Sequence, residues 1–391
     1  MTMITTTDDL TAACARLGQS SVLTVDTEFL RDSTFWPQLC LIQVAGDDFY
    51  CAIDTLAPKL DLAPFYELMR DEKILKVFHS ARQDVEIFVH EMGGVPYPLF
   101  DTQVAAMVCG YGESVGYETL VNKLTGAKLD KAVRFTDWSK RPLSRRQIDY
   151  ALGDVIHLRD VFAKLFAKLE QNGRGSWIDE EMAVLTDTAT YRLHPEDAWR
   201  RLKPRSRNRR FLALVQALAE WRETEAQRKN VPRNRIVRDD IIMELAAHPP
   251  HTEDELGAIR GFSKRSAESK EGQSLLAAVA RAEALPDSDL PEAEHEDRSV
   301  GNSPLSDLIK VLLKLRCQEN GVAPKLVASS GDLELIAQGG HPEIAALHGW
   351  RYELFGRDAE AIREGRLGLA VRGGRLVILD IQDDGTAVTR A

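Results

Sequence analysis

Two acidic residues near the start of the chain, Asp26 and Glu28, have a spacing suited to a shared metal ion. They lie two apart in the run SVLTVDTEF, which is typical of a β-strand. Side chains two apart on a strand point to the same face, about 7 Å apart along the backbone. Burial of both carboxylates costs free energy unless a cation neutralises them, so the pair indicates a cation site, although a solvated strand end would show the same pattern.

Two other segments could add a ligand or a group that handles protons. Tyr150 and Asp154 lie four apart in a segment with helical periodicity, which places them on one face about one turn apart. Asp84 follows the apolar run ILKVF and lies in the first turns of the next predicted helix, where an acid also stabilises the helix N-terminus. Taken alone, neither pattern is specific for a functional site.

The three segments together resemble the motifs of a nuclease superfamily. VDTEF, FHSARQDVEIF and DWSKRPLSRRQIDYALGDV resemble the three motifs of the DEDD exonucleases in their tyrosine subtype, and Asp149 stands where the histidine subtype carries its histidine. The runs DTEFLRDSTFWPQLCLIQV and DWSKRPL are similar to the ribonuclease D family. The resemblance covers about residues 20–170 and extends more loosely through later helical segments, which look like paired helicase-and-RNase-D C-terminal (HRDC) domains.

The resemblance implies hydrolysis of phosphodiesters with two divalent metal ions. Two such ions, about 3.5–4 Å apart, activate the attacking water and stabilise the leaving 3′ oxygen. Mg²⁺ and Mn²⁺ prefer oxygen ligands, and four carboxylates balance the charge of two divalent cations. The implied metal ligands are Asp26, Glu28, Asp84 and Asp154, with Asp26 at the family's bridging position. Tyr150, a phenol with an ordinary pKa of about 10, would orient the attacking water.

Three neighbouring residues are candidates for substrate binding, each with an alternative role. Phe29 follows Glu28 and either belongs to the core or, as the resemblance implies, wedges against the terminal base of the substrate. Lys140 and Arg141, near Trp138, either contact a substrate phosphate or pair with surface acids.

Three further polar residues are explained without a catalytic role. Asp101 precedes a predicted helix, which makes an N-cap a better interpretation than a metal ligand. His79 and His157 stand singly beside apolar runs and are not expected to take part in catalysis.

The elements that must position these residues predict an α/β domain. They are strands at 21–29, 39–45, 49–53 and 74–78, and helices near 59–70, at 81–91 and from about 145 to 169. Ser144 is a suitable N-cap for the long helix. The order of strands and helices indicates a mixed sheet. The expected fold class is an α/β exonuclease domain with a mixed, ribonuclease-H-like sheet, followed by two all-α HRDC-type domains.

A basic stretch follows the exonuclease motifs. Residues 200–238 contain 13 basic and 3 acidic residues, a net charge of +10 in a chain whose net charge is −10. Such a stretch is either a solvated surface or a site for RNA, whose phosphates attract Lys and Arg. The candidate RNA-binding residues in this stretch are Arg205, Arg207, Arg209 and Arg210.

Changes in composition divide the chain into five segments. These are the exonuclease domain at 1–172, a helical connector at 173–203, a first HRDC domain at 204–284, an acidic linker at 285–302, and a second HRDC-type domain with a C-terminal hairpin at 303–391. The linker combines Pro, Ser and acids without periodicity. The hairpin is predicted from two apolar runs around a Gly-Gly pair.

The composition also limits the class of protein. With 44% hydrophobic and 28% charged residues, the chain of 391 residues is neither collagenous nor wholly disordered. Its five cysteines lack CxxC spacing, so neither a disulfide framework nor a zinc site is expected. No apolar run approaches the roughly 20 residues of a transmembrane helix, and the N-terminus lacks the pattern of a signal peptide. We expect a cytoplasmic monomer with no membrane partner.

These observations favour a metal-dependent 3′→5′ exoribonuclease that uses Mg²⁺ or Mn²⁺. The resemblance to the ribonuclease D family implies that it trims tRNA precursors and other structured RNAs with single-stranded 3′ ends, and that it releases nucleoside 5′-monophosphates. A 3′→5′ DNA exonuclease is an alternative, since no residue named above is assigned to a 2′-OH. A non-catalytic nucleic-acid-binding scaffold is another, although a scaffold has no chemical reason to keep four carboxylates and Tyr150.

Overall fold

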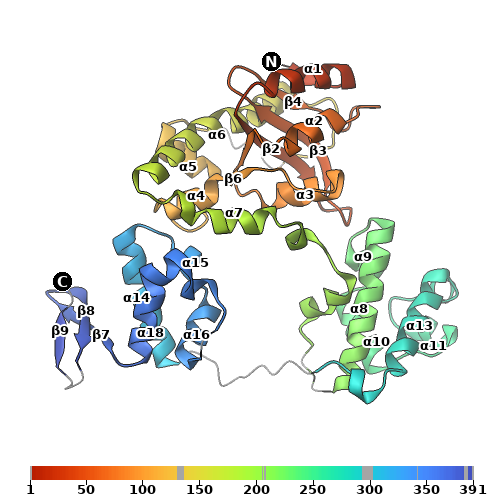
Figure 1. Cartoon of the computed structure of the whole chain (residues 1–391). Coiled ribbons are helices and arrows are strands. Elements are labelled where there is room, and N and C mark those ends of the chain that lie inside the picture. Colours follow the sequence, from red (N-terminus) through yellow and green to blue (C-terminus); the bar gives the residue numbers. More distant parts are fainter. Residues whose placement is uncertain are drawn as a thin grey trace.

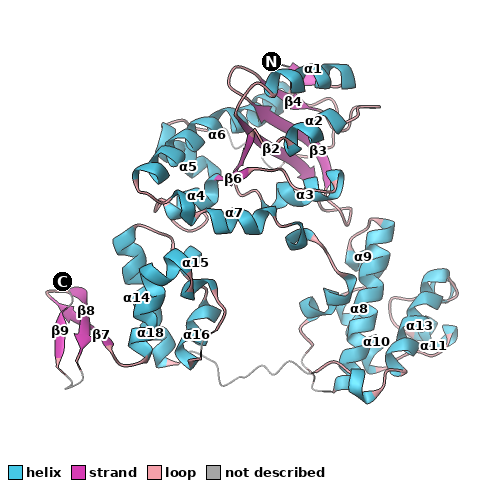
Figure 2. Cartoon of the chain, viewed as in Figure 1, coloured by secondary structure: helices cyan, strands magenta, loops and turns pink. Residues whose placement is uncertain are grey.

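The computed structural model describes residues 2–129, 136–204, 206, 208–292, 303–340, 342–382 and 386–389. Within them the chain forms an α/β domain, two helical units and a small C-terminal sheet (Figures 1 and 2). The predicted fold class, a mixed sheet followed by helical regions, is confirmed. None of the helices in these ranges is both long and apolar enough to cross a membrane.

A six-stranded mixed sheet, in the order β1-β4-β3-β2-β5-β6, forms the core of the first domain. Its strands are β1 (Thr2–Ile4), β2 (Val22–Leu30), β3 (Gln38–Ala45), β4 (Tyr50–Ile53), β5 (Leu75–Phe78) and β6 (Leu99–Asp101). β2, β3 and β4 pair antiparallel, as successive strands with short connections can, whereas β1, β5 and β6 pair parallel with their neighbours. β1 and β6 are too short to show a strand pattern in the sequence.

Helices cover both faces of this sheet. They are α1 (Thr7–Leu17), α2 (Ala63–Arg70), α3 (Arg82–Met92), α4 (Thr102–Val108), α5 (Tyr117–Thr125) and α6 (Arg145–Gln171). Because side chains alternate along a strand, Leu23 and Val25 of β2 belong to the core formed with α1, α2 and α3. Thr24 points to the other face, where its hydroxyl donates to the carbonyl of Val155 in α6 at 2.7 Å. The even-numbered residues of β2, which include Asp26 and Glu28, therefore face α6.

The long helix α6 begins where the sequence predicts. Ser144 is its N-cap, and the Ser144 and Gln147 side chains form a reciprocal capping box with each other's backbone N–H groups. The cap fixes the register of the helix, so Tyr150 and Asp154 lie on a single face one turn apart.

The first helical unit has a core of its own. It contains α8 (Arg209–Lys229), α9 (Arg233–Ile236), α10 (Asp239–Ala247), α11 (Glu253–Ala258), α12 (Lys264–Ala267) and α13 (Lys270–Glu283). Leu218, Ile242 and Leu275 are fully buried in this core. It is connected to the α/β domain through α7 (Asp179–Thr186) and 3₁₀ segments that end at Leu202.

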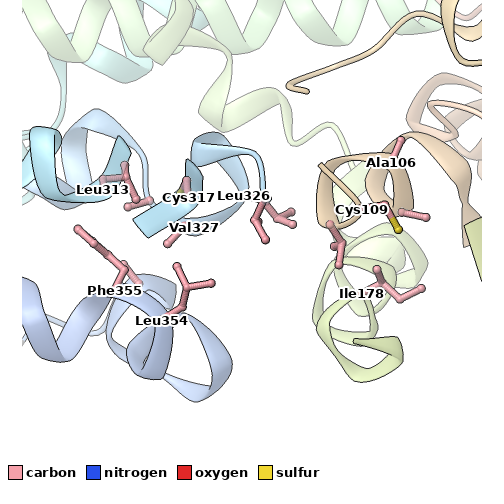
Figure 3. Close-up of a cluster of buried hydrophobic side chains, with 14 of the residues drawn as sticks. Ala106, Cys109, Ile178, Leu313, Cys317, Leu326, Val327, Leu354 and Phe355 are labelled. Atoms are coloured by element: carbon pink, nitrogen blue, oxygen red, sulfur yellow. The ribbon is translucent and has the colours of Figure 1, made fainter. Parts of the chain in front are cut away.

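The second helical unit shares its core with the α/β domain. It contains α14 (Pro304–Asn320), α15 (Pro324–Val327), α16 (Ser330–Gln338), α17 (Gly349–Arg351) and α18 (Arg357–Arg363). Figure 3 shows Leu326 on the side of this unit that faces Cys109 and Ile178 of the α/β domain. Ala323 also donates its backbone N–H to the carbonyl of Met107 at 3.0 Å. Apolar side chains therefore form part of the interface between this unit and the α/β domain.

A buried arginine strengthens the same interface. Arg351 is 2% exposed, and its guanidinium binds the carboxylates of both Glu180 and Glu181 at the start of α7. Beside it, the rings of Trp350 and Trp177 stack with their centroids 4.3 Å apart. After α18 the chain forms a sheet of β7 (Leu367–Arg372), β8 (Arg375–Ile381) and β9 (Ala387–Thr389).

Candidate active site

Three carboxylates from two different elements meet beside the central strand. Asp26 and Glu28 of β2 and Asp154 of α6 each offer an oxygen atom, and these three atoms lie within 4.8 Å of one another. β2 contributes two of them because its side chains repeat every second residue, and α6 contributes the third because it crosses that face of the sheet. Residues 128 positions apart in sequence, Asp26 and Asp154, are thereby brought together.

Asp84 joins these residues from a third element, α3. It lines the same cavity of about 640 Å³ as the three carboxylates and Tyr150. Its carboxylate accepts a hydrogen bond from the hydroxyl of Thr27, which lies between Asp26 and Glu28 on β2. All five residues that the sequence assigned to catalysis therefore face one cavity.

The electrostatics of the cavity favour a bound cation. Burial raises the pKa of Asp26 to about 6, against the hydrogen bond from the backbone N–H of Thr27. Burial and the nearby Asp26 raise the pKa of Asp84 well above its ordinary value, and the Thr27 hydroxyl opposes this. Carboxylates so close together repel one another unless cations neutralise them. The donor set is entirely oxygen, which fits Mg²⁺ or Mn²⁺.

Tyr150 keeps its proton at this site. Its side chain is hydrogen-bonded to Asp154, and its ring packs at 6.3 Å from Trp138. Burial, followed by the charges of Asp154 and Glu28, raises its pKa above the ordinary range of a phenol. A protonated hydroxyl held beside a carboxylate can position a water molecule but cannot remove its proton.

Two hydrogen bonds that the sequence does not predict hold α6 in place, one from strand β2 and one from helix α5. Thr24 donates to the carbonyl of Val155, and the hydroxyl of Tyr117 donates to the carbonyl of Asp154. Both acceptors lie in the middle of a helix, where each carbonyl is already used by the helix itself and still has a second lone pair. These bonds set the depth of Asp154 relative to β2. Thr24 and Tyr117 carry no local signal because their partners are more than 30 residues away.

Asp101 organises the turn that precedes Asp84. Its carboxylate accepts from the N–H groups of Ser80 at 2.9 Å, Ala81 at 2.8 Å and Gln103 at 2.7 Å. The bond from Gln103 confirms the predicted N-cap. Ser80 has a φ of +61°, a conformation that costs free energy for a residue with a side chain, so Asp101 offsets this strain. Asp101 thus positions the helix that carries Asp84.

His79 lies in the wall of the cavity, which its sequence context does not indicate. Thr102 donates its hydroxyl proton to the carbonyl of Phe78, so it accepts the bond from Nδ1 of His79 at 3.0 Å. Burial lowers the pKa of His79, and the ring is therefore neutral. It lies 5.2 Å from the ring of Tyr117. His157, by contrast, does not line the cavity.

Comparison with known proteins identifies the family. The 3′-5′ exonuclease family model matches residues 1–170, and the HRDC domain model matches residues 211–279. Ribonuclease D of Granulibacter bethesdensis is 50% identical over 97% of this chain and 96% of its own length. Ribonuclease D of Acidiphilium cryptum is 51% identical over 97% of each chain. The chain belongs to the ribonuclease D family. It is therefore a 3′-5′ exoribonuclease, a hydrolase of phosphodiester bonds.

Solved structures agree with membership of the ribonuclease D family. The Escherichia coli RNase D structure, described as an exoribonuclease involved in structured RNA processing, has a TM-score of 0.79 at 30% identity, over 93% of this chain and 98% of that one. The catalytic core of RRP6 from Trypanosoma brucei, at 22% identity and a TM-score of 0.56 over 72% of this chain and 80% of that one, shares the fold. The HRDC model covers the first helical unit, and the second lies outside the matched residues.

The candidate substrate-binding residues near the ribonuclease D active site have different surroundings. Phe29 lines the cavity directly beside Glu28, as a wedge would. The side chain of Lys140 is 81% exposed, with its ammonium 3.8 Å from Asp137, so it is accessible to a phosphate.

Arg141 is committed to the fold. Its guanidinium binds both carboxylate oxygens of Asp54, at 2.6 and 2.8 Å, and donates to the carbonyls of Cys40 and Trp138 at 2.7 Å each. A guanidinium whose donors are occupied in this way is not available to RNA. We therefore correct the prediction for Arg141 to a structural role, the second of the two that its sequence context allows.

The basic residues of 200–238 are less available to bind RNA than the sequence indicates. Arg205 and Arg207 lie outside the described residues. Arg209 donates to the carbonyl of Leu290 at 2.5 Å, and Arg210 pairs with Asp287 at 2.5 Å. These two arginines therefore join the start of α8 to the segment that follows α13, and their contact with RNA stays a prediction.

Acids from outside the stretch neutralise many of its other charges. The pairs are Arg200 with Asp197, Arg222 with Asp239, and both Arg228 and Lys229 with Glu271. Of the basic residues of 200–238 that the structure describes, three have exposed side chains for which it records no hydrogen bond or ion pair: Lys203, Arg235 and Arg238. Among the described residues of the stretch, these three side chains are therefore the most accessible to a phosphate.

Proposed function

We propose that this enzyme hydrolyses RNA from its 3′ end with two divalent ions, Mg²⁺ or Mn²⁺, held by Asp26, Glu28, Asp84 and Asp154. We further propose that its substrates are tRNA precursors and other small structured RNAs with single-stranded 3′ ends, and that each cycle releases a nucleoside 5′-monophosphate. The observation that carries the proposal is the convergence of four carboxylates from three elements on one cavity, three of them with oxygens within 4.8 Å.

The donor chemistry supports the metal assignment. Neighbouring ionised carboxylates repel one another when no cation lies between them, and burial already raises the pKa of Asp26 and Asp84. When bound, two divalent ions activate water and stabilise the leaving 3′ oxygen. Asp26 is the best placed to bridge, since it is near Glu28 and Asp154 and also interacts electrostatically with Asp84.

Two further residues of the cavity, Tyr150 and Phe29, have proposed roles that do not require a change of ionisation. Tyr150 keeps its proton, and its hydroxyl, hydrogen-bonded to Asp154, would orient the attacking water. Phe29, in the cavity wall, would stack on the terminal base of the RNA. Stacking tolerates any base, which suits an enzyme that must advance along a strand.

RNA as the substrate is supported by the family and by the relative from Escherichia coli, which is described as acting in structured RNA processing. We propose Lys140 near the cavity and Lys203, Arg235 and Arg238 on the helical side as contacts to phosphates. All four side chains are exposed, and the structure records no hydrogen bond or ion pair for the side chains of Lys203, Arg235 and Arg238. We assign a monomer in the cytoplasm, and size-exclusion chromatography with light scattering tests the first part.

The deciding experiment compares two substrates under two metal conditions. Purified protein is incubated with a tRNA that carries a 3′ extension and with single-stranded DNA of matched sequence, in Mg²⁺ or Mn²⁺ and then with EDTA. We expect shortening of the RNA one nucleotide at a time, release of 5′-monophosphates, and complete loss of activity in EDTA. Equal shortening of the DNA would favour a DNA exonuclease, and binding without shortening would favour a scaffold.

A further inference from the structure

The first helical unit contacts the loop that follows the catalytic strand. This loop, residues 31–37, connects β2 to β3 and is called the β2–β3 loop below. The side-chain oxygen of Asn230 accepts hydrogen bonds from the backbone N–H groups of Phe35 at 3.1 Å and Trp36 at 3.0 Å. Asn230 is the C-cap of α8, with φ and ψ both at +49°, a left-handed conformation that Asn adopts more readily than most residues. The helix end therefore determines where the amide points.

Other contacts hold the loop from two sides. On the helical side, the guanidinium of Arg233 lies 4.5 Å from the ring centroid of Phe35. Glu223, which is 1% exposed, holds that guanidinium with two bonds of 2.5 Å. On the side of the α/β domain, Trp36 stacks on His90 of α3 with 4.4 Å between the ring centroids. The loop is thus packed between α3 and the C-terminal end of α8.

The β2–β3 loop is continuous with the wall of the active site. Arg31, its first residue, pairs with Glu86 of α3 and lies over the ring of Phe29 at 5.8 Å. Phe29 lines the catalytic cavity. The pairing of β2 with β3 shifts register between Glu28 and Phe29, so the regular ladder is interrupted at the point where the strand leaves the site. The position of Phe29 therefore depends on contacts made beyond the strand.

We propose that Asn230 is a positioning residue for RNA binding, which acts through the β2–β3 loop to hold Phe29 against the 3′-terminal nucleotide. The inference rests on the proposed function, since it assigns a part of the same site. It gives the first helical unit a role that does not require its own contact with RNA. Substrates too short to reach the helical unit should therefore still depend on it.

The test uses two substitutions at one position. Asn230→Gly removes the acceptor but suits the left-handed C-cap, so the helix end is preserved. Asn230→Asp keeps an acceptor for the same two N–H groups. On a short single-stranded RNA, loss of the two bonds in Asn230→Gly should raise KM about three- to tenfold with kcat within about twofold, because an interaction made equally in the ground and transition states is lost. Asn230→Asp should have the KM of the wild type.

A matched control comes from the other end of α8. Asn208 is its N-cap and accepts from the N–H groups of Arg210 and Phe211, but it does not touch the β2–β3 loop. Asn208→Ala should weaken the helical unit, which thermal melting would report, without a change in KM. An equal rise of KM in Asn208→Ala would overturn the proposal, because it would show a general effect of destabilisation.

A double-mutant cycle tests whether Asn230 acts through Phe29. In a Phe29→Ala background, Asn230→Gly should raise KM by less than it does in the wild type, since the group that it positions is gone. Effects that multiply fully, or an unchanged KM in Asn230→Gly alone, would contradict the proposal. If the proposed function itself is wrong, the wild-type protein will not shorten the RNA at all, which distinguishes that failure from failure of this proposal.

Discussion

The hydroxyl of Thr27 donates a hydrogen bond to the carboxylate of Asp84. Thr27 lies between the two acids of β2, and Asp84 lies in the first turn of α3, so one bond joins two of the three elements that carry the site. The bond stabilises the ionised form of Asp84 against the burial that disfavours it. Thr27 is therefore expected to tune the site although its own side chain points away from Asp26 and Glu28.

Replacement of Thr27 tests this role. Thr27→Val keeps the shape of the side chain and removes the donor, so Asp84 should be harder to ionise. We expect the Mg²⁺ concentration needed for half-maximal activity to rise about 10–100-fold, the usual range for loss of a partner of a metal ligand. Activity should recover at saturating Mg²⁺. A variant with the metal dependence of the wild type would contradict the role assigned to Thr27.

Asp26→Asn should abolish turnover while the fold is retained, because it removes a charge of the proposed bridging ligand but little volume. Metal ions supply several kcal/mol of transition-state stabilisation, so we expect a loss of at least about a hundredfold. Nuclease assays with the variant check this, with circular dichroism as the control for folding. Activity above a few per cent of that of the wild type would argue against the metal assignment.

We also expect the stability difference between Asp26→Asn and the wild type, both without metal, to depend on pH. The pKa of Asp26 in the folded protein, about 6, is above its ordinary value of 3.8, so its contribution to stability is present below about pH 4 and is lost as the pH rises through 6. Asn cannot ionise. In EDTA, the melting temperature of Asp26→Asn should therefore exceed that of the wild type at pH 7, and the difference should disappear near pH 4.

Tyr150→Phe should lower kcat by about 10²–10⁴, the range for a positioned group that handles a proton or orients water. Its ring contact with Trp138 is retained, so stability and metal affinity should change little. Single-turnover assays at saturating Mg²⁺ measure the effect. A rate equal to that of the wild type would leave Tyr150 with a packing role alone.

Gln43 is a buried amide whose removal should stabilise the protein. It lies opposite Asp26 on β3 and is fully buried, and neither polar atom of its side chain has a hydrogen-bond partner among the described residues. The Met side chain has a similar volume and no amide group. Gln43→Met should therefore raise the free energy of unfolding by about 1–2 kcal/mol. Denaturant titration measures this. Gln38→Met, at the exposed start of the same strand, is the control and should change it little.

Lys203, Arg235 and Arg238 should account for part of the salt dependence of RNA binding. Their simultaneous replacement by Glu should weaken binding of a tRNA-sized substrate and reduce the slope of log affinity against log salt by about 1 for each lost phosphate contact. Lys310→Glu, an exposed change on α14, is the control and should leave the slope unaltered. An unaltered slope in the triple variant would show a solvated surface.

The sequence by itself predicted much of the candidate site because its signals are local. The period of two in β2 places Asp26 and Glu28 on one face of the strand. The spacing of four in α6 places Tyr150 and Asp154 on one face of the helix. The capping box at Ser144 fixes the start of that helix. Together with the family motifs, these patterns selected five residues, and all five line a single cavity.

The tertiary structure decided which side chains are free to act. Arg141 is basic and near the site, but it is bound to Asp54, which lies 87 positions away in sequence. Arg210 pairs with Asp287, and Asn230 reaches a loop 194 positions before it. Thr24 and Tyr117 hold α6 in the same way, through partners on other elements. Periodicity and capping depend on neighbours in the chain, whereas these pairings depend on how separate elements pack, and for that reason only the fold determines them.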